Sequence, residues 1–397
     1  FSLQGFLMIF FLSFCYISFD LKSASANTFD VTSYGAKGDG NTDDSEAFIQ
    51  AWADLCGDSS SDPTLIIPSG MTFLISQVTF MGPCQFPTVN IKLLGNITAP
   101  MTLDGWKDCK ENNYWIQFES VSGLTIEGPG QIDGQGSIWW RHLVTPETCD
   151  SPSALHFIKC DGLRLSGTTH INSPMLHISI VGCNDVDVGN LQILAPEYSP
   201  NTDGINIGAS SHVNIHDSII QTGDDCVAIN GGIVDLNVTG VYCGPGHGIS
   251  IGSLGENGGY DTVEQVRVEH CNISGTTNGL RIKTTPNGNG YARGILFQDI
   301  YLENVRNPII IDQHYCSSSS ENVDCSAPPS TPAVQVSDVT YMNIYGSSAT
   351  QQAITFDCSG CTGIVTNQVE ITGDVAFAYC RNAEGNFVDT TPNIICN

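Results

Sequence analysis

The sequence predicts an all-β fold, a right-handed parallel β-helix with a short N-terminal capping helix. Short apolar-x-apolar strand cores recur along the chain, polar residues and glycines fill the intervals, and no helical periodicity lies between them. A β-sandwich is the alternative, but it would require hairpin turns at intervals of roughly 8 to 12 residues. The strand cores are Leu124/Ile126, Leu163/Leu165, Val186/Val188, Val213/Ile215, Leu236/Val238, Val266/Val268, Ile295/Phe297 and Val339/Tyr341.

The spacing of these cores predicts one coil for each interval. Successive cores lie 39, 23, 27, 23, 30, 29 and 44 residues apart, mostly in the twenties. The two long intervals each need about one extra coil or a long loop. The second contains Cys316, Cys325 and the pair Pro328-Pro329, which predicts a loop stapled by a disulfide.

The N-terminal region predicts a secretory signal. Residues 6–19 form a short apolar block, and Ala24-Ser25-Ala26 fits the small-x-small rule for cleavage. Residues 1–26 are therefore interpreted as a secretory signal peptide, with a buried N-terminal helix as the alternative. Because no linker divides the remainder, residues 27–397 are expected to form a single parallel β-helix catalytic domain.

A helix is expected to cover the apolar end of the first coil. Asp43 as the N-cap and Glu46 three residues later predict its start in the form of a capping box. One helical face then carries the residues Ala47, Phe48, Ala51, Trp52 and Leu55. We interpret this segment as an amphipathic lid over the solenoid.

The charge balance excludes some partners. Lys+Arg 14 against Asp+Glu 41 gives a formal net charge of −27, the opposite of the basic surface that binds a phosphate backbone. We expect no nucleic-acid partner. Beyond the signal, no run is apolar over the roughly 18 residues that are needed to span a bilayer, so we expect no membrane association after cleavage. We also expect the protein to be a monomer.

The cysteines and sequons are typical of an extracellular protein. Of 16 cysteines, Cys15 leaves with the signal, and the rest indicate structural disulfides in an oxidising compartment, with one thiol left over. Spacing does not fix the pairing. Reasonable pairs are Cys226 with Cys243, Cys358 with Cys361 and Cys380 with Cys396. Glycosylation sequons, which also occur by chance, begin at Asn96, Asn237 and Asn272.

Four polar motifs mark successive repeats in the middle of the chain. They are Asn201-Thr202-Asp203-Gly204, Gly223-Asp224-Asp225-Cys226, Gly246-His247-Gly248 and Arg281-Ile282-Lys283. Asp203 to Asp224 is 21 residues and Asp225 to His247 is 22, so a coil of that length returns the chain to the same face. The 34 residues from His247 to Arg281 need a loop as well. Each motif alone is more typical of a turn or a solvated bend, but together they predict one site.

Clustered carboxyl groups favour acid–base chemistry on a glycosidic bond. Mutual repulsion raises the pKa of at least one, which can then protonate a leaving group while its neighbours activate water. Adjacent strand residues face opposite sides, so Asp224 and Asp225 can share a site only at a bend, and Gly223 permits one.

Two cations and a tyrosine suggest an anionic sugar. Arg281 and Lys283 lie at i and i+2, on one strand face, where they suit a substrate carboxylate; a structural ion pair with surplus acids is the alternative. Tyr315, in Asp312-Gln313-His314-Tyr315, could stack or hydrogen-bond at the same cleft, or could be a packed core residue.

In this order, the four motifs resemble those of the polygalacturonases, which degrade pectin, and the similarity to the plant members begins near Tyr34-Gly35-Ala36. The resemblance implies a right-handed parallel β-helix, and hydrolysis of α-1,4 bonds of polygalacturonate with inversion and without a metal or other cofactor. It implies that Asp224 is the general acid, that Asp203 and Asp225 position and deprotonate the attacking water, and that His247 supports the acid. It assigns substrate binding to Asn201, Arg281, Lys283 and Tyr315.

The expected enzyme is secreted to the cell wall, acts on pectin and has an acidic pH optimum. Endo action is slightly favoured over exo action. One alternative is a pectate lyase, which would use Ca²⁺ and an arginine base, but Gly246-His247-Gly248 would then have no role. Another is a wall protein that binds pectin without turnover, although the three aspartates argue against it.

Overall fold

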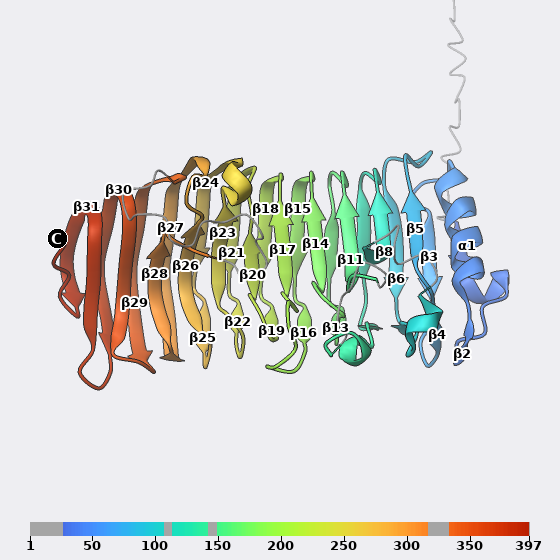
Figure 1. Cartoon of the computed structure of the whole chain (residues 1–397). Helices are drawn as coiled ribbons and strands as arrows, with labels where there is room; N and C mark the ends of the chain where they lie inside the picture. The colour runs from blue at the N-terminus through green and yellow to red at the C-terminus, as the bar shows by residue number, and fades with distance from the viewer. Residues whose placement is uncertain (1–26, 107–112, 142–148, 317–332, 397) are drawn as a thin grey trace, which may run out of the picture.

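The structure is a computed structural model that describes residues 27–106, 113–141, 149–316 and 333–396. Its described part is a right-handed parallel β-helix, in which 31 strands pair in parallel and join into one continuous sheet wound into coils (Figure 1). Figure 1 shows α1 at one end of the stack and the C-terminal strands at the other. The predicted fold class is confirmed, and the strands form three stacks, one on each side of the coils.

Stack 1 contains the strand cores that the sequence predicts. Leu165 aligns with both Ile126 and Val188, and Phe297 aligns with Tyr341 in the last of these coils. Its strands are β1 (Thr28–Asp30), β3 (Thr64–Ile67), β6 (Val89–Leu93), β9 (Leu124–Glu127), β12 (Arg164–Ser166), β15 (Asn184–Gly189), β18 (Ser211–His216), β21 (Ile233–Thr239), β24 (Tyr260–Glu269), β27 (Asn289–Val305), β29 (Gln335–Ser348), β30 (Gln352–Thr372) and β31 (Phe377–Thr391).

Stack 2 is the face on which the polar motifs lie. In β17, Ile205 and Ile207 point into the core while Asn206 between them points out, and the neighbouring strands repeat this alternation. Its strands are β5 (Val78–Met81), β8 (Tyr114–Glu119), β11 (Ser153–Ile158), β14 (Ile178–Val181), β17 (Ile205–Gly208), β20 (Val227–Ile229), β23 (Ile249–Leu254), β26 (Asn278–Thr284) and β28 (Asn307–Asp312), followed by β30 and β31.

Stack 3 closes the coils and consists mostly of very short strands. They are β2 (Asp39–Asp43), β4 (Thr72–Leu74), β7 (Asn96–Thr98), β10 (Gln131–Asp133), β13 (Thr169–Ile171), β16 (Gln192–Leu194), β19 (Ile219–Gln221), β22 (Tyr242–Cys243) and β25 (Asn272–Ser274), followed by the later parts of β27 and β29. Short 3-10 helices lie at η1 (Val31–Tyr34), η2 (Leu103–Gly105), η3 (Gly136–Ile138) and η4 (Glu256–Gly258).

The two long intervals between cores contain loops and not extra coils. β9 pairs directly with β12, and β27 pairs directly with β29, so each interval is a single coil enlarged by its loop. Cys316 is disulfide-bonded, but the rest of the expected stapled loop, including Cys325, lies outside the described residues.

The capping helix α1 (Ser45–Gly57) buries the predicted face against the first coils. Phe48 packs edge-on against Phe73, and the Trp52 indole nitrogen donates to the Met81 carbonyl at 3.1 Å. The predicted capping box is wrong in its details because the N-cap is Asp44. Its carboxylate accepts from the backbone amides of Lys37 and Gly38, a contact with the preceding loop that local spacing does not encode.

The three suggested disulfides are confirmed, and Cys56–Cys84 is a further one. The expectation of a single leftover thiol is wrong, because Cys160, Cys183 and Cys271 are all free and buried. They fill inward positions as small apolar side chains. Residues 1–26 lie outside the described part, so the signal peptide stays a prediction. None of the helices within the described ranges is long and apolar enough to span a membrane.

Candidate active site

The register of stack 2 brings three predicted site residues into one row. Ile205, Val227 and Ile249 are paired neighbours on β17, β20 and β23. Asp203, Asp225 and His247 each precede one of these residues by two positions, so they lie one above another at intervals of about 4.8 Å. We call them row 1. A second row of outward residues lies on β17, β20, β23 and β26 and consists of Asn206, Ala228, Ser250 and Arg281; we call it row 2.

Row 1 lines one open cleft of about 640 Å³, together with Asn206, Ala228 and Arg281 of row 2. Ser250 is fully buried beneath it. All eight residues that the sequence analysis singles out contribute to its lining: Asn201, Asp203, Asp224, Asp225, His247, Arg281, Lys283 and Tyr315. The structure therefore places together every residue that was expected to act in catalysis or substrate binding.

Asp225 is the most deeply placed of the three carboxylates, with 2% of its surface exposed. Its Oδ1 accepts from Arg281 Nη2 at 2.7 Å and from the Ser250 hydroxyl at 2.8 Å, and its Oδ2 lies 3.4 Å from Lys283 Nζ. A buried charge requires such compensation. The sequence left two interpretations of Arg281 and Lys283 open, substrate binding and a structural ion pair. Both cations do pair with Asp225, and they also line the cleft that was expected to bind the substrate.

Asp224 bends away from its neighbour and faces His247. Its Oδ1 accepts from the Asp225 amide at 2.8 Å and lies 2.9 Å from His247 Nδ1. Burial opposes ionisation of Asp224, but these hydrogen bonds and the charges of His247 and Lys283 outweigh it and lower its pKa. This contact is a hydrogen bond in which either the imidazole N–H or the carboxyl O–H is the donor, depending on which group carries the proton.

Gly223 makes this bend possible. A Cβ at position 223 would lie 1.9 Å from the Ser199 carbonyl oxygen, a distance that no side chain tolerates. The Gly223 amide also donates to the Thr202 hydroxyl at 3.0 Å, which ties the two aspartate motifs together. The chain bends at Gly223 as predicted, but the close approach of the Ser199 carbonyl, and not a left-handed backbone conformation, is what requires a glycine here.

Asp203 is the carboxyl group of the cluster whose pKa rises. It is 8% exposed, and burial, then the nearby Asp225 and Asp224, hold its pKa well above the usual value. Its only direct side-chain hydrogen bond among the described residues is a long one, 3.4 Å from Asn206 Nδ2. We expected crowding to raise the pKa of at least one carboxyl group in the cluster, and the pKa of Asp203 is raised. The pKa of Asp224, the expected acid, is lowered instead.

Two further residues position this site and were not predicted from the sequence. Ser250 links Asp225 to Arg281 by also accepting from Arg281 Nε at 2.9 Å. Buried His177, whose pKa burial lowers to about 4, lies with Nδ1 3.0 Å from the Asp203 carbonyl oxygen. A signal for Ser250 was present, because a lone polar residue between Ile249 and Ile251 marks an outward position in an otherwise apolar strand.

The cleft continues past the cluster in both directions. Toward the N-terminus, Met175, Leu176 and Asn201 also line a second hollow of about 410 Å³, which contains Tyr114 and Trp140. Toward the C-terminus, the Tyr315 ring lies with its centroid 5.1 Å from Lys283 Nζ. The described groove is therefore longer than the cluster of aspartates and His247 itself.

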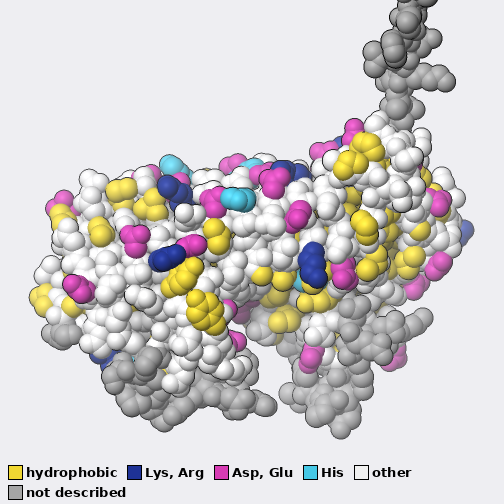
Figure 2. Space-filling view, turned by 90° about the horizontal axis from the view of Figure 1, so that it is seen from above, with side chains coloured by type: hydrophobic (Ala, Val, Ile, Leu, Met, Phe, Trp, Pro, Cys, Tyr) yellow, Lys and Arg dark blue, Asp and Glu magenta, His cyan; other side chains and the backbone are white. Residues whose placement is uncertain are grey.

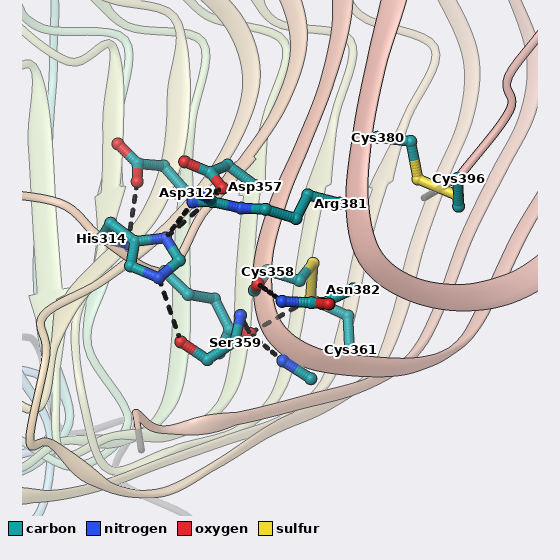
Figure 3. Close-up of a disulfide and its surroundings, with 12 residues drawn as sticks. Asp312, His314, Asp357, Cys358, Ser359, Cys361, Cys380, Arg381, Asn382 and Cys396 are labelled. Atoms are coloured by element: carbon teal, nitrogen blue, oxygen red, sulfur yellow. Dashed lines mark hydrogen bonds and ion pairs between the residues drawn. A yellow bond between two sulfur atoms is a disulfide. The ribbon is translucent and has the colours of Figure 1, made fainter. Parts of the chain in front are cut away.

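Figure 3 shows a second charged cluster, formed by Asp312, His314, Asp357 and Arg381, and it adjoins this groove because Asp312 also lines the cleft. His314 Nδ1 lies 3.5 Å from an Asp357 carboxylate oxygen, and Arg381 forms an ion pair with the same oxygen. Burial, aided by the charge of Asp357, raises the pKa of Asp312.

Two groups of described residues have the composition of a metal site: Asp224, Asp225 and His247, and Asp312, His314 and Asp357. In each group a guanidinium already occupies a carboxylate oxygen, from Arg281 in the first and from Arg381 in the second. A cation would have to displace these contacts, so the donor sets fit hydrogen-bonded carboxylates better than a metal centre.

Comparison with known proteins identifies the family. Residues 56–391 match the family described as glycosyl hydrolases family 28. The chain belongs to this family. Curated relatives include a probable polygalacturonase of Arabidopsis thaliana, 47% identical over 94% of this chain and 81% of the relative, and a polygalacturonase of Prunus persica, 42% identical over 95% of both. The family 28 chain is therefore a glycoside hydrolase, and its resemblance to plant polygalacturonases is confirmed.

Solved structures of the family share the fold. A family 28 exopolygalacturonase of Yersinia enterocolitica superposes with a TM-score of 0.72 at 18% identity, over 94% of this chain and 78% of the other. A polygalacturonase of Erwinia carotovora superposes with a TM-score of 0.65 at 21% identity, over 94% and 97%. These matches support the right-handed parallel β-helix.

Proposed function

We propose that this glycoside hydrolase is a polygalacturonase that hydrolyses α-1,4-galacturonosidic bonds of pectin with inversion. The observation that carries the proposal is the meeting, in one cleft, of three aspartates and a histidine with Arg281 and Lys283. Carboxyl groups supply the acid and base of glycoside hydrolysis, and cations suit a uronic acid. The names of the curated relatives support the same substrate.

In the proposed mechanism Asp224 protonates the leaving oxygen. Its partly exposed side chain faces the cleft and lies 2.9 Å from His247 Nδ1. Although burial opposes ionisation, the contact with His247 lowers the pKa of Asp224, so the carboxyl group carries the proton it needs only at acidic pH. Asp203 and Asp225 hold and deprotonate the attacking water. Because the pKa of Asp203 is raised, Asp225, which is paired with Arg281 and Lys283, takes the proton of this water. Inversion requires room for that water between acid and base, about 6.5 to 9.5 Å between their carboxyl groups.

Substrate binding is assigned to the residues around this cluster. Arg281 and Lys283 both contact Asp225. An arginine has five N–H donors and a lysine has three, so both residues retain donors for a galacturonate carboxylate. Tyr315 beside Lys283 offers a ring face, and Asn201 lies where the two hollows join.

Endo action is favoured by the length of the groove. A chain that is cut internally must extend from the catalytic cluster on both sides, and the described cleft continues toward Tyr114 and toward Tyr315. We further propose that residues 1–26 direct secretion to the cell wall and are removed, and that residues 27–397 act there as a monomeric single domain at acidic pH.

The function is tested by digesting polygalacturonate at about pH 5 with the purified protein and with Asp224→Asn, while viscosity, reducing ends and ultraviolet absorbance are followed together. A fast fall in viscosity with saturated oligomers, lost in the variant, is expected. Slow loss of viscosity with many reducing ends would indicate exo action. Unsaturated products lost on chelation would indicate a Ca²⁺-dependent lyase, and binding without new ends would indicate a non-enzymatic wall protein.

A further inference from the structure

A row of exposed aromatic side chains runs along stack 3, the side of the coils formed by β19, β22, β25 and the later parts of β27 and β29. The strand register aligns Ile219 with Tyr242, Tyr242 with Asn272, Asn272 with Tyr301, and Tyr301 with Tyr345. Tyr242 is 59% exposed and Tyr301 is 38% exposed. Such a row is unusual on a surface that alternates apolar-in and polar-out, and the catalytic cleft on stack 2 does not use it.

Between the two tyrosines lies a hollow of about 350 Å³, within the range of small-ligand sites of roughly 300 to 1,000 Å³. Tyr242 and Tyr301 form its flanks, and Asn272 lies between them, one coil from each. The Tyr301 ring is held by a tilted contact with Tyr345 at 5.4 Å between centroids. Polar groups of Gln221, Ser274 and Glu303 complete the lining.

Asn272 is also the first residue of the sequon Asn272-Ile273-Ser274. The other two sequons lack this setting. Asn96 aligns with Thr72 and Gln131, and Asn237 aligns with Asn214 and Arg267, so neither has an aromatic register partner in the adjacent coils. The sequon in the aromatic hollow is therefore distinct from the two that stand among polar residues.

We propose that Asn272 is N-glycosylated and that the first sugars of its glycan lie in the hollow between Tyr242 and Tyr301. Sugar rings present C–H faces that pack on aromatic rings, and their hydroxyl and acetamido groups suit the polar lining. The hollow is assigned to this glycan because Asn272, to which the glycan would be attached, is part of the lining. The inference rests on the proposed passage of the chain through the secretory pathway.

The modification requires a lipid diphosphate-linked oligosaccharide as co-reactant. The Asn272 side-chain nitrogen forms a bond to C1 of the first sugar, and the C1–O bond to the diphosphate breaks. The lipid diphosphate leaves with the electron pair, and the amide nitrogen loses one proton. The reaction precedes folding, so the hollow does not select the sequon but receives its product.

Occupancy is tested on the full chain secreted from plant cells, by enzymatic glycan release in heavy-oxygen water and peptide mapping. Asn272 is expected to carry the label in the wild type and in Ser274→Thr, which keeps the sequon, and to lose it in Ser274→Ala. A chain found in the medium with Asn272 unmodified would overturn this inference alone. A chain retained in the cytosol would overturn the proposed secretion as well.

The position of the glycan is tested by the rate at which an endoglycosidase trims it on the native protein. Loss of two ring contacts in Tyr242→Ser/Tyr301→Ser is expected to speed trimming at Asn272 by about tenfold. Tyr260→Ser, which removes a 71% exposed tyrosine elsewhere, is the matched control and should not change the rate. Equal rates in the double variant and the wild type would show that the glycan does not occupy the hollow.

Discussion

Replacing Asp225 with asparagine should destabilise the protein through the cations that it leaves behind. Asp225 is buried, with Arg281 Nη2 at 2.7 Å and Lys283 Nζ at 3.4 Å from its carboxylate oxygens. Two unit charges with centres about 4 Å apart attract by about 4 kcal/mol at an effective dielectric constant of about 20. Breaking a buried pair costs about 3 to 5 kcal/mol because one charge stays buried without compensation. We therefore expect Asp225→Asn to lower the free energy of unfolding by about 3 kcal/mol.

A double-mutant cycle isolates this effect. Arg281→Met should also destabilise the protein, and the double variant should lose about 2 kcal/mol less than the sum of the single losses. The assay is guanidinium denaturation at fixed pH with disulfides intact. Glu264→Gln, which breaks the more exposed pair of Glu264 with Arg293, is the matched control and should change the midpoint little. Additive losses, or an Asp225→Asn variant as stable as the control, would show that the buried ion pair does not stabilise the fold.

Three further predictions follow from the cleft. Because burial and then Asp225 and Asp224 raise the pKa of Asp203, the stability that this group contributes is full below its unfolded pKa of about 4 and is lost as pH rises through the raised value. Asp203→Asn should therefore flatten the fall in unfolding temperature between about pH 4 and pH 7, and an equal fall in both proteins would count against this. His247→Asn removes the imidazole 2.9 Å from Asp224 and should lower kcat by roughly 10- to 100-fold at acidic pH with KM nearly constant; unchanged kcat would exclude its role. Tyr315→Leu removes the ring beside Lys283 and should raise KM about fivefold with less effect on kcat, whereas the reverse pattern would place Tyr315 in the chemical step.

The coils could be predicted because the strand cores alternate strictly. Val213 and Ile215 point inward, and each must lie over an inward residue of the next coil, here Leu236 and Val238. The same regularity placed Asp203, Asp225 and His247 in one row. Three disulfides could be suggested because their cysteines are close in sequence, the longest separation being 17 residues.

Three features could not be predicted from the sequence: the Cys56–Cys84 disulfide, the role of Ser250 and the raised pKa of Asp203. Each depends on contacts between segments that loops of unequal length separate in the sequence. Cys56 and Cys84 meet because the capping helix folds back on the first coils. Ser250 becomes part of the site only because Arg281 is its register partner across an irregular loop. The raised pKa of Asp203, and not of Asp224, follows from burial and hydrogen bonding that no spacing encodes.

The most direct test of the proposed mechanism is proton NMR of the first product formed from a galacturonate oligomer, before its reducing end equilibrates. An inverting hydrolase with Asp224 as acid and an activated water in the same cleft converts the α-linkage into a β-anomeric reducing end. We predict that the β anomer appears first. An initial α anomer, or an unsaturated product, would contradict the account.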